Sequence, residues 1–227
     1  MKIIAILQAR LGSTRLPNKV LLPLLDKPMV QHIIERVQRA TLLDDVVLAV
    51  PKEAESLKLE AIANVTKCIY ARFDHIPAED VIGRYCGAAR AYAAEIIVRI
   101  PCDNPCIDPA YIDQAIQDYL KDTYTYYSNT TAACGMTVVD GIGVEVCSAS
   151  RLRWLDQRSQ GHALWREHPH RFFEERGLIR FPPADLRLDV NTQADYEYIR
   201  ALYDHFGHNR FTTAEVVAYL DTKKVPA

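Results

Sequence analysis

The chain has 227 residues, of which 49% are hydrophobic and 25% are charged, values typical of one soluble globular domain. The apolar run over residues 3–7 is shorter than the ~7–15 residues of a secretory h-region or the ~20 residues of a membrane span, so we expect a cytoplasmic protein with no membrane partner. The net charge of −2 disfavours a general nucleic-acid binder, which usually carries a basic surplus. The six cysteines form no C-x-x-C pair, and we expect free thiols instead of a zinc site.

The hydrophobic pattern predicts strands and helices that alternate along the first half of the chain. In chain order these are a strand at 2–9, a helix at 28–40, a strand at 45–50, helices at 53–64 and 78–93, a strand at 95–100 and a helix at 109–121. The second half differs, with strands expected at 124–128, 143–147 and 186–190 and helices at 149–157, 193–206 and 213–220. Strands that alternate with helices indicate βαβ units and a mainly parallel sheet. We therefore predict a single Rossmann-like three-layer α/β/α domain over residues 1–227.

Three loops are expected at the carboxyl ends of the parallel strands, where such sheets bind ligands. They cover residues 10–19, 101–109 and 191–195. The region around the first of these loops is basic, because residues 1–40 hold seven Lys or Arg against two acidic residues. This asymmetry favours a local anionic ligand over a polyanion.

The loop at 10–19 has the ingredients of a polyphosphate site, although it matches neither a P-loop nor a G-x-G-x-x-G motif. It combines a glycine that allows close backbone approach with two hydroxyls and three cations, namely Gly12, Ser13, Thr14, Arg10, Arg15 and Lys19. Arginine makes forked contacts to phosphate, and lysine acts as a point charge. Composition alone equally allows a solvated basic loop.

The order of residues in six segments resembles the sugar-acid cytidylyltransferases, the family of 3-deoxy-manno-octulosonate and acylneuraminate cytidylyltransferases. Residues 8–19 read Q-A-R-L-G-S-T-R-L-P-N-K, like the signature Q-A-R-x-G-S-T-R-L-P-G-K of the branch for spore coat polysaccharide biosynthesis. The other segments are P-L-L-D-K-P-M at 23–29, E-D-V-I-G-R-Y at 79–85, V-R-I-P-C-D-N-P-C-I-D-P at 98–109, D-G-I-G-V-E-V at 140–146 and R-E-H at 166–168. The resemblance spans residues 1–200 in order.

The resemblance implies a fold of the nucleotide-diphospho-sugar transferase type and a nucleotidyl transfer. An acceptor oxygen attacks the α-phosphorus of CTP, pyrophosphate leaves and a CMP-linked product forms, in the biosynthesis of a cell-surface polysaccharide or glycan. Such a reaction needs mainly positioning and charge neutralisation. The residues that the resemblance implies to be catalytic are Lys19, Arg10 and Asp103, and those implied to contact the nucleotide are Ala9, Gly12, Ser13 and Arg15.

The resemblance also implies a Mg²⁺ cofactor. Asp103 occupies the place of one family ligand, although a lone Asp in a loop is often only a turn former or a helix cap. The second family ligand corresponds to Asn191 in the segment V-N-T-Q-A-D-Y-E, and Asp189 lies two residues earlier, on the same face if this segment is a strand. Asp189 either supplies the missing charge or only caps the loop. Pro101 and Cys102 replace the T-G of the family, a departure close to the expected base site.

For the acceptor, the candidates are Asp140, Glu145, Arg166, Glu167 and His168, and Asp80 is a further candidate for substrate binding. Glu145 alternatively faces solvent from its strand, and the segment at 166–168 alternatively forms an exposed helix face or a dimer contact. His168 is also a candidate proton acceptor, because an unperturbed imidazole titrates near neutrality. The resemblance implies a nucleotide-binding half at 1–122, a half for acceptor binding and dimerisation at 123–227, and CTP, a small anionic acceptor and a second copy of the chain as partners.

Two other functions compete with this interpretation. A glycosyltransferase that uses a nucleotide sugar would share the nucleotide-binding half, but the sequence has no Asp-x-Asp metal motif. A nucleotide-binding pseudoenzyme is favoured by Asn191 and by the change at 101–102, and is opposed by the presence of Arg10, Lys19 and Asp103.

Overall fold

The computed structural model describes residues 1–52, 56–122 and 124–224. At its centre is a six-stranded sheet in the order β5-β4-β1-β6-β10-β7. The strands are β5 (Ile69–Phe73), β4 (Asp45–Pro51), β1 (Ile3–Gln8), β6 (Ile96–Pro101), β10 (Glu145–Ser148) and β7 (Tyr127–Ser128). The first four run parallel, and β10 is antiparallel to both of its neighbours. The predicted α/β class with a mainly parallel sheet is confirmed.

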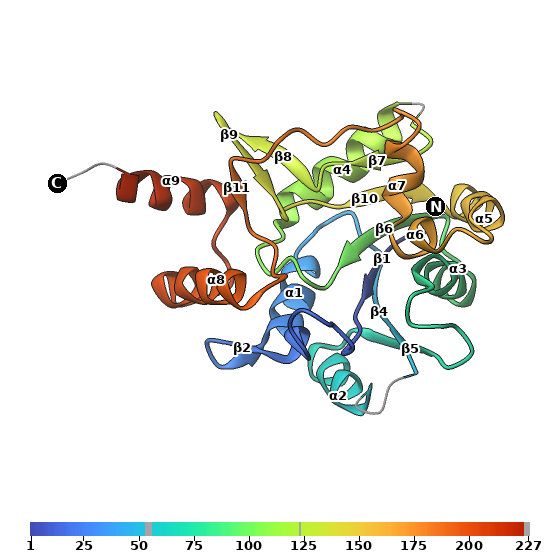
Figure 1. Ribbon diagram of the computed structural model, residues 1–227, viewed down its shortest axis with the longest axis horizontal. Helices are drawn as coiled ribbons and strands as arrows, with labels where there is room; N and C mark the ends of the chain where they lie inside the picture. Colours follow the sequence, from blue (N-terminus) through green and yellow to red (C-terminus); the bar gives the residue numbers. More distant parts are fainter. Residues whose placement is uncertain (53–55, 123, 225–227) are drawn as a thin grey trace.

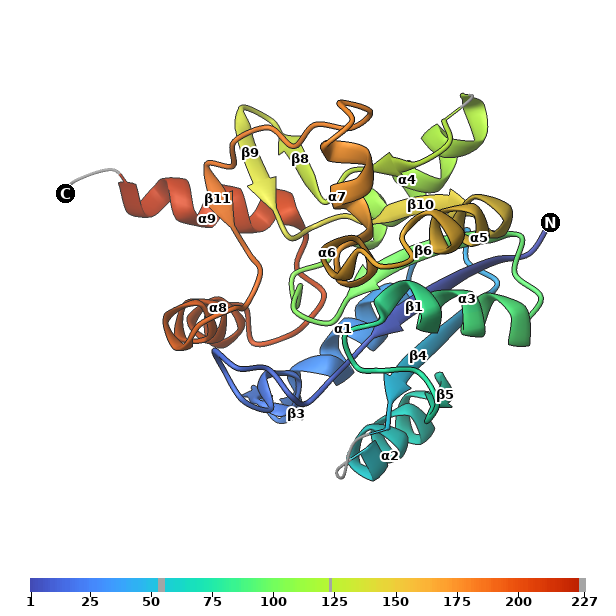
Figure 2. The same ribbon diagram turned by 45° about the vertical axis from the view of Figure 1, so that its right-hand side comes forward.

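Helices cover both faces of this sheet, which gives the three predicted layers (Figures 1 and 2). Along β1, Ala5 and Leu7 pack into one apolar core, while Ile4 and Ile6 pack into the other. The first core includes α1 (Met29–Val37), α2 (Ser56–Thr66) and α4 (Pro109–Lys121), and the second includes α3 (Val81–Ala91), α5 (Ala149–Arg158) and α7 (Pro169–Glu174). A strand buried on both faces is apolar throughout, which explains the continuous apolar run of β1.

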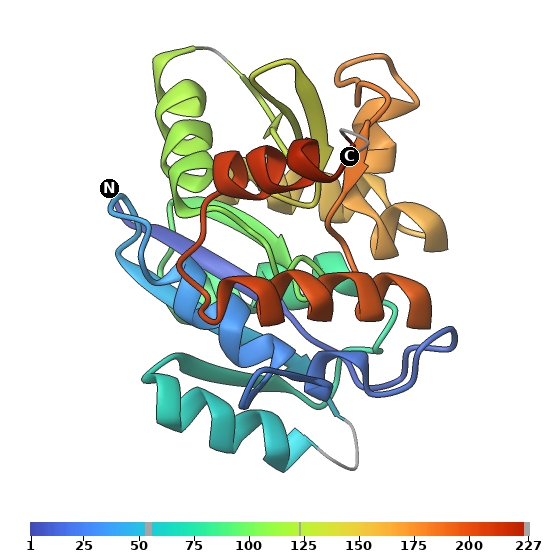
Figure 3. The ribbon, with the colours of Figure 1, turned by 90° about the vertical axis from the view of Figure 1, so that its left-hand side faces the viewer.

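The second half of the chain adds smaller pieces around the carboxyl edge of the sheet. The strands β8 (Thr131–Cys134), β9 (Thr137–Asp140) and β11 (Leu186–Arg187) form a three-stranded sheet in the order β11-β9-β8. The helices α8 (Gln193–Phe206) and α9 (Thr213–Lys224) lie on the side of the main sheet that α1 and α4 cover (Figure 3). A short helix, α6 (Ala163–Glu167), leads into α7.

Several predicted boundaries differ from the structure. Of the expected strand at 186–190, only β11 (Leu186–Arg187) is a strand in the structure, and of the expected strand at 124–128, only β7 (Tyr127–Ser128) is one. Residues 53–55 of the predicted helix at 53–64 lie outside the described residues, and α2 continues to Thr66. The predictions missed β5, the hairpin of β2 (Pro23–Leu24) and β3 (Lys27–Pro28), the pair β8–β9, and α6 and α7. These elements are short or lie at an edge, so they lack the long apolar period on which the predictions rest.

The proposed division into two halves at 122/123 stays a prediction, and residue 123 lies outside the described residues. All six cysteines are free thiols, as expected, and all except Cys134 are buried. Within the described part of the chain, no helix combines the length and the apolar character that crossing a bilayer requires.

Candidate active site

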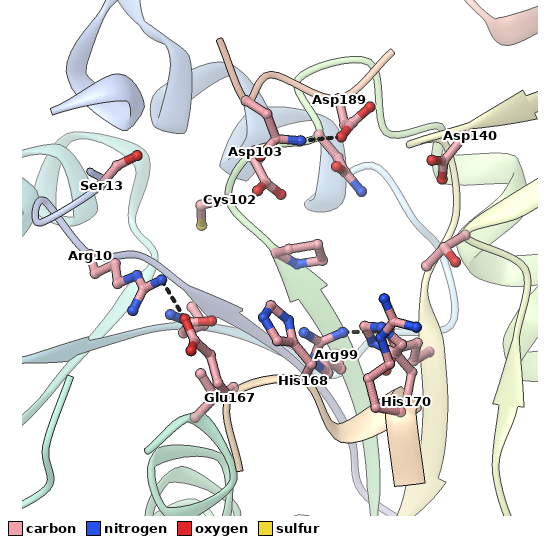
Figure 4. Close-up of a pocket in the computed structure, with 18 of the residues that line it drawn as sticks. Arg10, Ser13, Arg99, Cys102, Asp103, Asp140, Glu167, His168, His170 and Asp189 are labelled. Atoms are coloured by element: carbon pink, nitrogen blue, oxygen red, sulfur yellow. Dashed lines mark hydrogen bonds and ion pairs between the residues drawn. The ribbon is translucent and has the colours of Figure 1, made fainter. Parts of the chain in front are cut away.

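A polar cavity of about 970 Å³ opens at the carboxyl edge of the parallel strands, between the loop after β1, the loop after β6 and the second half of the chain (Figure 4). It brings together most of the residues that the sequence singled out: Arg10, Gly12, Ser13, Arg15, Lys19, Asp103, Asp140, Glu145, His168, Asp189 and Asn191. All three loops predicted at this edge contribute to it. The topology explains the first two, because β1 and β6 are parallel and end at the same edge of the main sheet. The third loop follows β11 of the small sheet and reaches the cavity from the second half of the chain.

The basic loop after β1 is held against the core by apolar residues that flank its polar ones. Leu16 and Val20 are buried, while Ser13 and Arg15 line the cavity. Asn18 adopts a left-handed backbone conformation (φ 55°), which its type tolerates, and its amide donates to the carbonyl of Leu11 at 3.2 Å. The turn delivers Lys19 into the first position of the 3₁₀ helix η1 (Lys19–Leu21).

Lys19 connects all three loops of the site. Its ammonium donates to Asp103 Oδ2 at 2.9 Å, to the Val190 carbonyl at 2.7 Å and to Asn191 Oδ1 at 3.4 Å. The backbone joins the same loops, since the Val190 amide donates to the Asp103 carbonyl at 2.7 Å. A cation therefore sits between the carboxylate and the amide oxygen that the sequence proposed as metal ligands.

Asn191 is held from both sides in the loop after β11. Its Oδ1 accepts from Arg15 at 2.8 Å, and its Nδ2 donates to Asp189 Oδ2 at 2.5 Å. Arg187 donates two hydrogen bonds to the Asp189 carboxylate, from Nε to Oδ1 at 3.1 Å and from Nη2 to Oδ2 at 2.8 Å. Figure 4 shows Asp103 and Asp189 at one side of the cavity, and the hydrogen bonds of Asn191 to Lys19 and Asp189 place it there too. Hard oxygen ligands of this kind suit Mg²⁺.

Arg10 crosses the cavity to the second half of the chain. Its Nη2 lies 2.6 Å from Glu167 Oε1, at the end of α6. Figure 4 shows this pair and His168 on the side of the cavity opposite Asp103 and Asp189. The side chain predicted to hold phosphate is therefore bound to a carboxylate in this structure.

Glu145 does not face solvent, which was one of the two alternatives from the sequence. Its side chain is 3% exposed and pairs with Arg99, directly opposite in the β6–β10 register. It also accepts from the Tyr126 hydroxyl, and His170 Nδ1 lies 3.5 Å from its Oε1. Burial by itself raises the pKa of Glu145, but the charge of Arg99, with help from His170, holds this pKa below its ordinary value.

His168 lines the cavity and is half-buried. Burial lowers the pKa of its imidazole, the charge of Glu167 opposes this, and His170 and Arg99 lower it further. An imidazole with a lowered pKa is neutral at physiological pH and can accept a proton, which agrees with one of the roles considered for His168.

Asp140 belongs to the wall that the small sheet contributes. Its Oδ1 accepts from the Thr131 hydroxyl at 3.0 Å, and its Oδ2 lies 3.7 Å from Arg187. Hydroxyl and carboxylate groups along this wall can hydrogen-bond the hydroxyls of a sugar-like acceptor.

The structure places three of the predicted contact residues away from the cavity lining. Ala9 is buried in the core, and Asp80 caps α3 by accepting from the Gly83 amide at 2.8 Å. Arg166 binds Asp80 at 2.7 Å and Asp156 at 2.9 Å, which ties α6 to α3 and α5. Asp80 and Arg166 therefore support the wall that carries Glu167 and His168.

Arg99, His170 and Arg187 are among the cavity residues that the predictions missed. Arg99 had a sequence signal, because it interrupts the apolar run of β6. Arg187 lies two residues before Asp189, on the strand that was expected to carry this carboxylate. For His170 the sequence offered nothing beyond its proximity to 166–168.

A mainly parallel sheet with a basic loop after its first strand and a carboxylate after β6 defines the class of nucleotidyltransferases. The family model described as cytidylyltransferase matches residues 4–216, so the chain belongs to the cytidylyltransferase family. It is 32% identical to the spore coat polysaccharide biosynthesis protein SpsF of Bacillus subtilis, over 96% of this chain and 94% of that protein. It is also 39% identical to the 3-deoxy-manno-octulosonate cytidylyltransferase of Trichlorobacter lovleyi, over 53% of this chain and 46% of the relative.

Solved structures agree with this assignment. A cytidylyltransferase from Leptospira borgpetersenii superposes with a TM-score of 0.86 at 27% identity, covering 98% of this chain and 95% of the other. The fold is shared with a CMP:2-keto-3-deoxy-manno-octonic acid synthetase complexed with CTP, with a TM-score of 0.68 at 19% identity over 90% of this chain and 99% of that one. The resemblance seen in the six sequence segments is confirmed at the level of the family.

Proposed function

We propose that the protein transfers CMP from CTP to a sugar acid or a related small anionic acceptor, with release of pyrophosphate, in the biosynthesis of a cell-surface polysaccharide or glycan. The family assignment supports the nucleotidyl transfer. The names of two relatives, a spore coat polysaccharide protein and a 3-deoxy-manno-octulosonate cytidylyltransferase, support the pathway and the acceptor class. The partners of this activity are CTP, the acceptor and, as the sequence resemblance implies, a second copy of the chain.

The observation that carries the proposal is the meeting of Lys19, Asp103 and Asn191 from three loops far apart in the sequence. An ammonium next to oxygen ligands at the mouth of a parallel sheet suits a triphosphate, whose charge must be neutralised before a nucleophile can approach. In this proposal Lys19 stabilises the charge that develops on the leaving pyrophosphate. Arg10, Arg15 and the Ser13 hydroxyl hold the phosphate oxygens.

Binding of the triphosphate must exchange contacts that the structure already contains. Arg10 has to leave Glu167, and Lys19 has to share Asp103 with the phosphates. Release of Glu167 would leave a carboxylate beside His168, on the acceptor side of the cavity. A phosphate oxygen then takes the place of a carboxylate oxygen on Arg10 and on Lys19. Both cations are therefore held in position by a carboxylate before the triphosphate binds.

The residues present fit a Mg²⁺ ion. Asp103, Asp189 and the Oδ1 of Asn191 supply hard oxygens, and Mg²⁺ commonly takes only one or two carboxylates besides phosphates and water. Asp189 is oriented by two hydrogen bonds from Arg187, and Asn191 is oriented by a hydrogen bond from Arg15. When bound, the ion would neutralise charge on the phosphate oxygens.

The proposal is tested by measuring pyrophosphate release from each of CTP, ATP, GTP and UTP, with and without Mg²⁺. The acceptor panel contains an octulosonic acid, a nonulosonic acid, a phosphorylated polyol and a phosphonate. We expect release that requires both an acceptor and Mg²⁺ and that is fastest with CTP. Equal rates with all four nucleotides would contradict the cytosine preference, and binding of CTP without release on any acceptor would favour the pseudoenzyme.

A further inference from the structure

A buried charged cluster forms the floor of the cavity on the acceptor side. Arg99 of β6 pairs with Glu145 of β10, and Glu145 also accepts from the Tyr126 hydroxyl. The side chains of Arg99 and Glu145 are only 11% and 3% exposed. The cluster borders the cavity, because Arg99, Glu145 and His170 all line it. Figure 4 shows Arg99 and His170 side by side there.

The pair lies in an otherwise apolar stretch of β6. The neighbouring residues of β6, Ile97, Val98 and Ile100, are apolar and fully packed. Burying two charges removes them from water, and replacing such a pair by apolar residues of similar size is often neutral or stabilising. The charges at the centre of a sheet therefore point to a use other than stability.

The cluster also has donor capacity that the protein does not use. Arg99 Nε and the Tyr85 hydroxyl are buried and have no hydrogen-bond partner among the described residues, although most buried polar groups in native structures have one. The guanidinium centre of Arg99 lies 5.9 Å from the centre of the Tyr85 ring, so the two unpaired groups belong to the same cluster. A guanidinium that lines a cavity and has unused donors is a site for a planar anion.

We propose that Arg99 is a specificity-determining residue that binds the carboxylate of the acceptor, and that Glu145 is a positioning residue that orients its guanidinium. The proposal rests on the proposed function and deepens it, because it selects carboxylate acceptors from the anionic candidates. Glu145 occupies Nη1 of Arg99, and the guanidinium borders the cavity, where such a group can bind a carboxylate.

The charge balance favours a carboxylate over a phosphate. Glu145 is ionised at neutral pH, since the charge of Arg99 opposes the effect of burial on its pKa. The pair is therefore neutral as a whole, and a dianion would lie close to the Glu145 charge. A monoanion suffers less repulsion there, and the cation Arg171 also lines the cavity.

The test uses pyruvate as a probe for a carboxylate next to an oxygen-bearing carbon, pyruvamide as its neutral analogue and inorganic phosphate as the competing anion. The full chain is titrated while the imidazole signals of His168 and His170 are followed by NMR, which requires no turnover. We expect saturable shifts of both imidazole signals with pyruvate and much smaller shifts with pyruvamide. Phosphate bound by Arg10 would reach His168 through Glu167, so the comparison between the two anions uses His170, which should respond much less to phosphate than to pyruvate. The absence of a pyruvate response, or an equal response of His170 to phosphate, would overturn the proposal.

Variants decide whether Arg99 is responsible. Arg99→Met is combined with Glu145→Gln, so that no buried charge is left unpaired. Arg99→Lys keeps a charge next to Glu145 but lacks the planar guanidinium. It serves as the second variant if the double variant does not fold. We expect each to weaken pyruvate binding at least tenfold. Arg90→Met, an exposed change in the last turn of α3, is the matched control and should bind as the wild type does.

The positioning role of Glu145 has its own readout. Glu145→Gln should raise the KM for a carboxylate acceptor while changing kcat little, and Glu145→Asp should partly restore that KM. Unchanged pyruvate affinity in both Arg99 variants would refute the binding of the carboxylate by Arg99, even if pyrophosphate release is normal. Conversely, a normal pyruvate response without any pyrophosphate release would refute only the proposed function.

Discussion

Lys19 is the side chain on which the proposed chemistry depends most directly. It is the group that contacts both Asp103 and Asn191. We expect Lys19→Ala to lower the rate of pyrophosphate release by about 10² or more, because a preorganised charge at a developing anion is lost. The measurement is single-turnover pyrophosphate release at saturating CTP.

The control for this substitution is Lys121→Ala, an exposed lysine at the end of α4 and outside the cavity. It should leave the rate unchanged. If Lys19→Ala releases pyrophosphate within a few-fold of the wild-type rate, in an assay limited by chemistry, Lys19 does not stabilise the leaving group.

Asn191 and Asp189 permit a second test at the scale of single residues. Asn191→Asp adds a carboxylate that Arg15 and Lys19 can neutralise, so the Mg²⁺ concentration for half-maximal rate should fall. Asp189→Ala removes a carboxylate from the same side of the cavity, so this concentration should rise. Both are read from a Mg²⁺ titration of the initial rate.

The two changes distinguish a ligand from a loop cap. If Asp189 only orders the loop through Arg187 and Asn191, its loss should lower the melting temperature without moving the Mg²⁺ titration. If neither variant shifts the titration while the wild type turns over, the metal is not held at this loop.

At the scale of elements, a single arginine of α1 joins segments that are distant in sequence. Arg36 is fully buried and donates to the carbonyls of Ile107 at 2.6 Å, Asn209 at 2.7 Å, Phe211 at 2.9 Å and Cys106 at 3.3 Å. These carbonyls belong to the loop after β6 and to the connection between α8 and α9. The contact links the loop that carries Asp103 to the C-terminal helices.

We expect Arg36→Met to lower the free energy of unfolding by about 3 kcal/mol or more, because it leaves several buried carbonyls without a donor. Urea titration measures this, with Arg90→Met on the exposed face of α3 as the control. A loss below about 1 kcal/mol would mean that water replaces the guanidinium, and that other contacts suffice to hold α8 and α9, such as the hydrogen bond from Tyr203 to the Pro105 carbonyl.

At the scale of the whole molecule, several buried titratable groups predict acid sensitivity. Burial lowers the pKa of His32 below its ordinary 6.5, although its hydrogen bond to the Leu24 carbonyl opposes this shift. The folded state therefore binds fewer protons than the unfolded state below pH 6.5, and stability falls as the pH drops through this range. The pKa of Glu145 is held below 4.5, so its contribution is present above that pH and is lost as the pH falls toward the folded-state pKa.

We expect the free energy of unfolding to decline gradually below pH 6.5 and more steeply below pH 4.5. Unfolding by urea at a series of pH values measures this curve. His32→Gln keeps a donor for Leu24 but cannot titrate, so it should flatten the part of the curve just below pH 6.5. An unchanged slope in this variant would assign the sensitivity to other groups, among them His168.

Local sequence pattern determined the class of fold and the placement of the first two loops. The apolar runs of β1, β4 and β6 and the amphipathic helices between them are properties of short segments, and a parallel sheet then brings the ends of its strands to one edge. The basic loop at 10–19 and Asp103 could therefore be placed at the site from their order alone. The short strands of the second half carried too little periodicity for this.

Only the tertiary structure decided which side chains share the cavity and which support it. From the sequence, Glu145 could equally have faced solvent, and the register of β10 against β6 set it opposite Arg99 in the interior. Likewise Arg166 was a candidate for substrate contact until packing of α6 against α3 directed it to Asp80. Residue type and spacing define what a side chain can bind. Long-range packing and strand register define which partner is within reach, because the contacts that decide it join residues 46 and 86 positions apart in the chain.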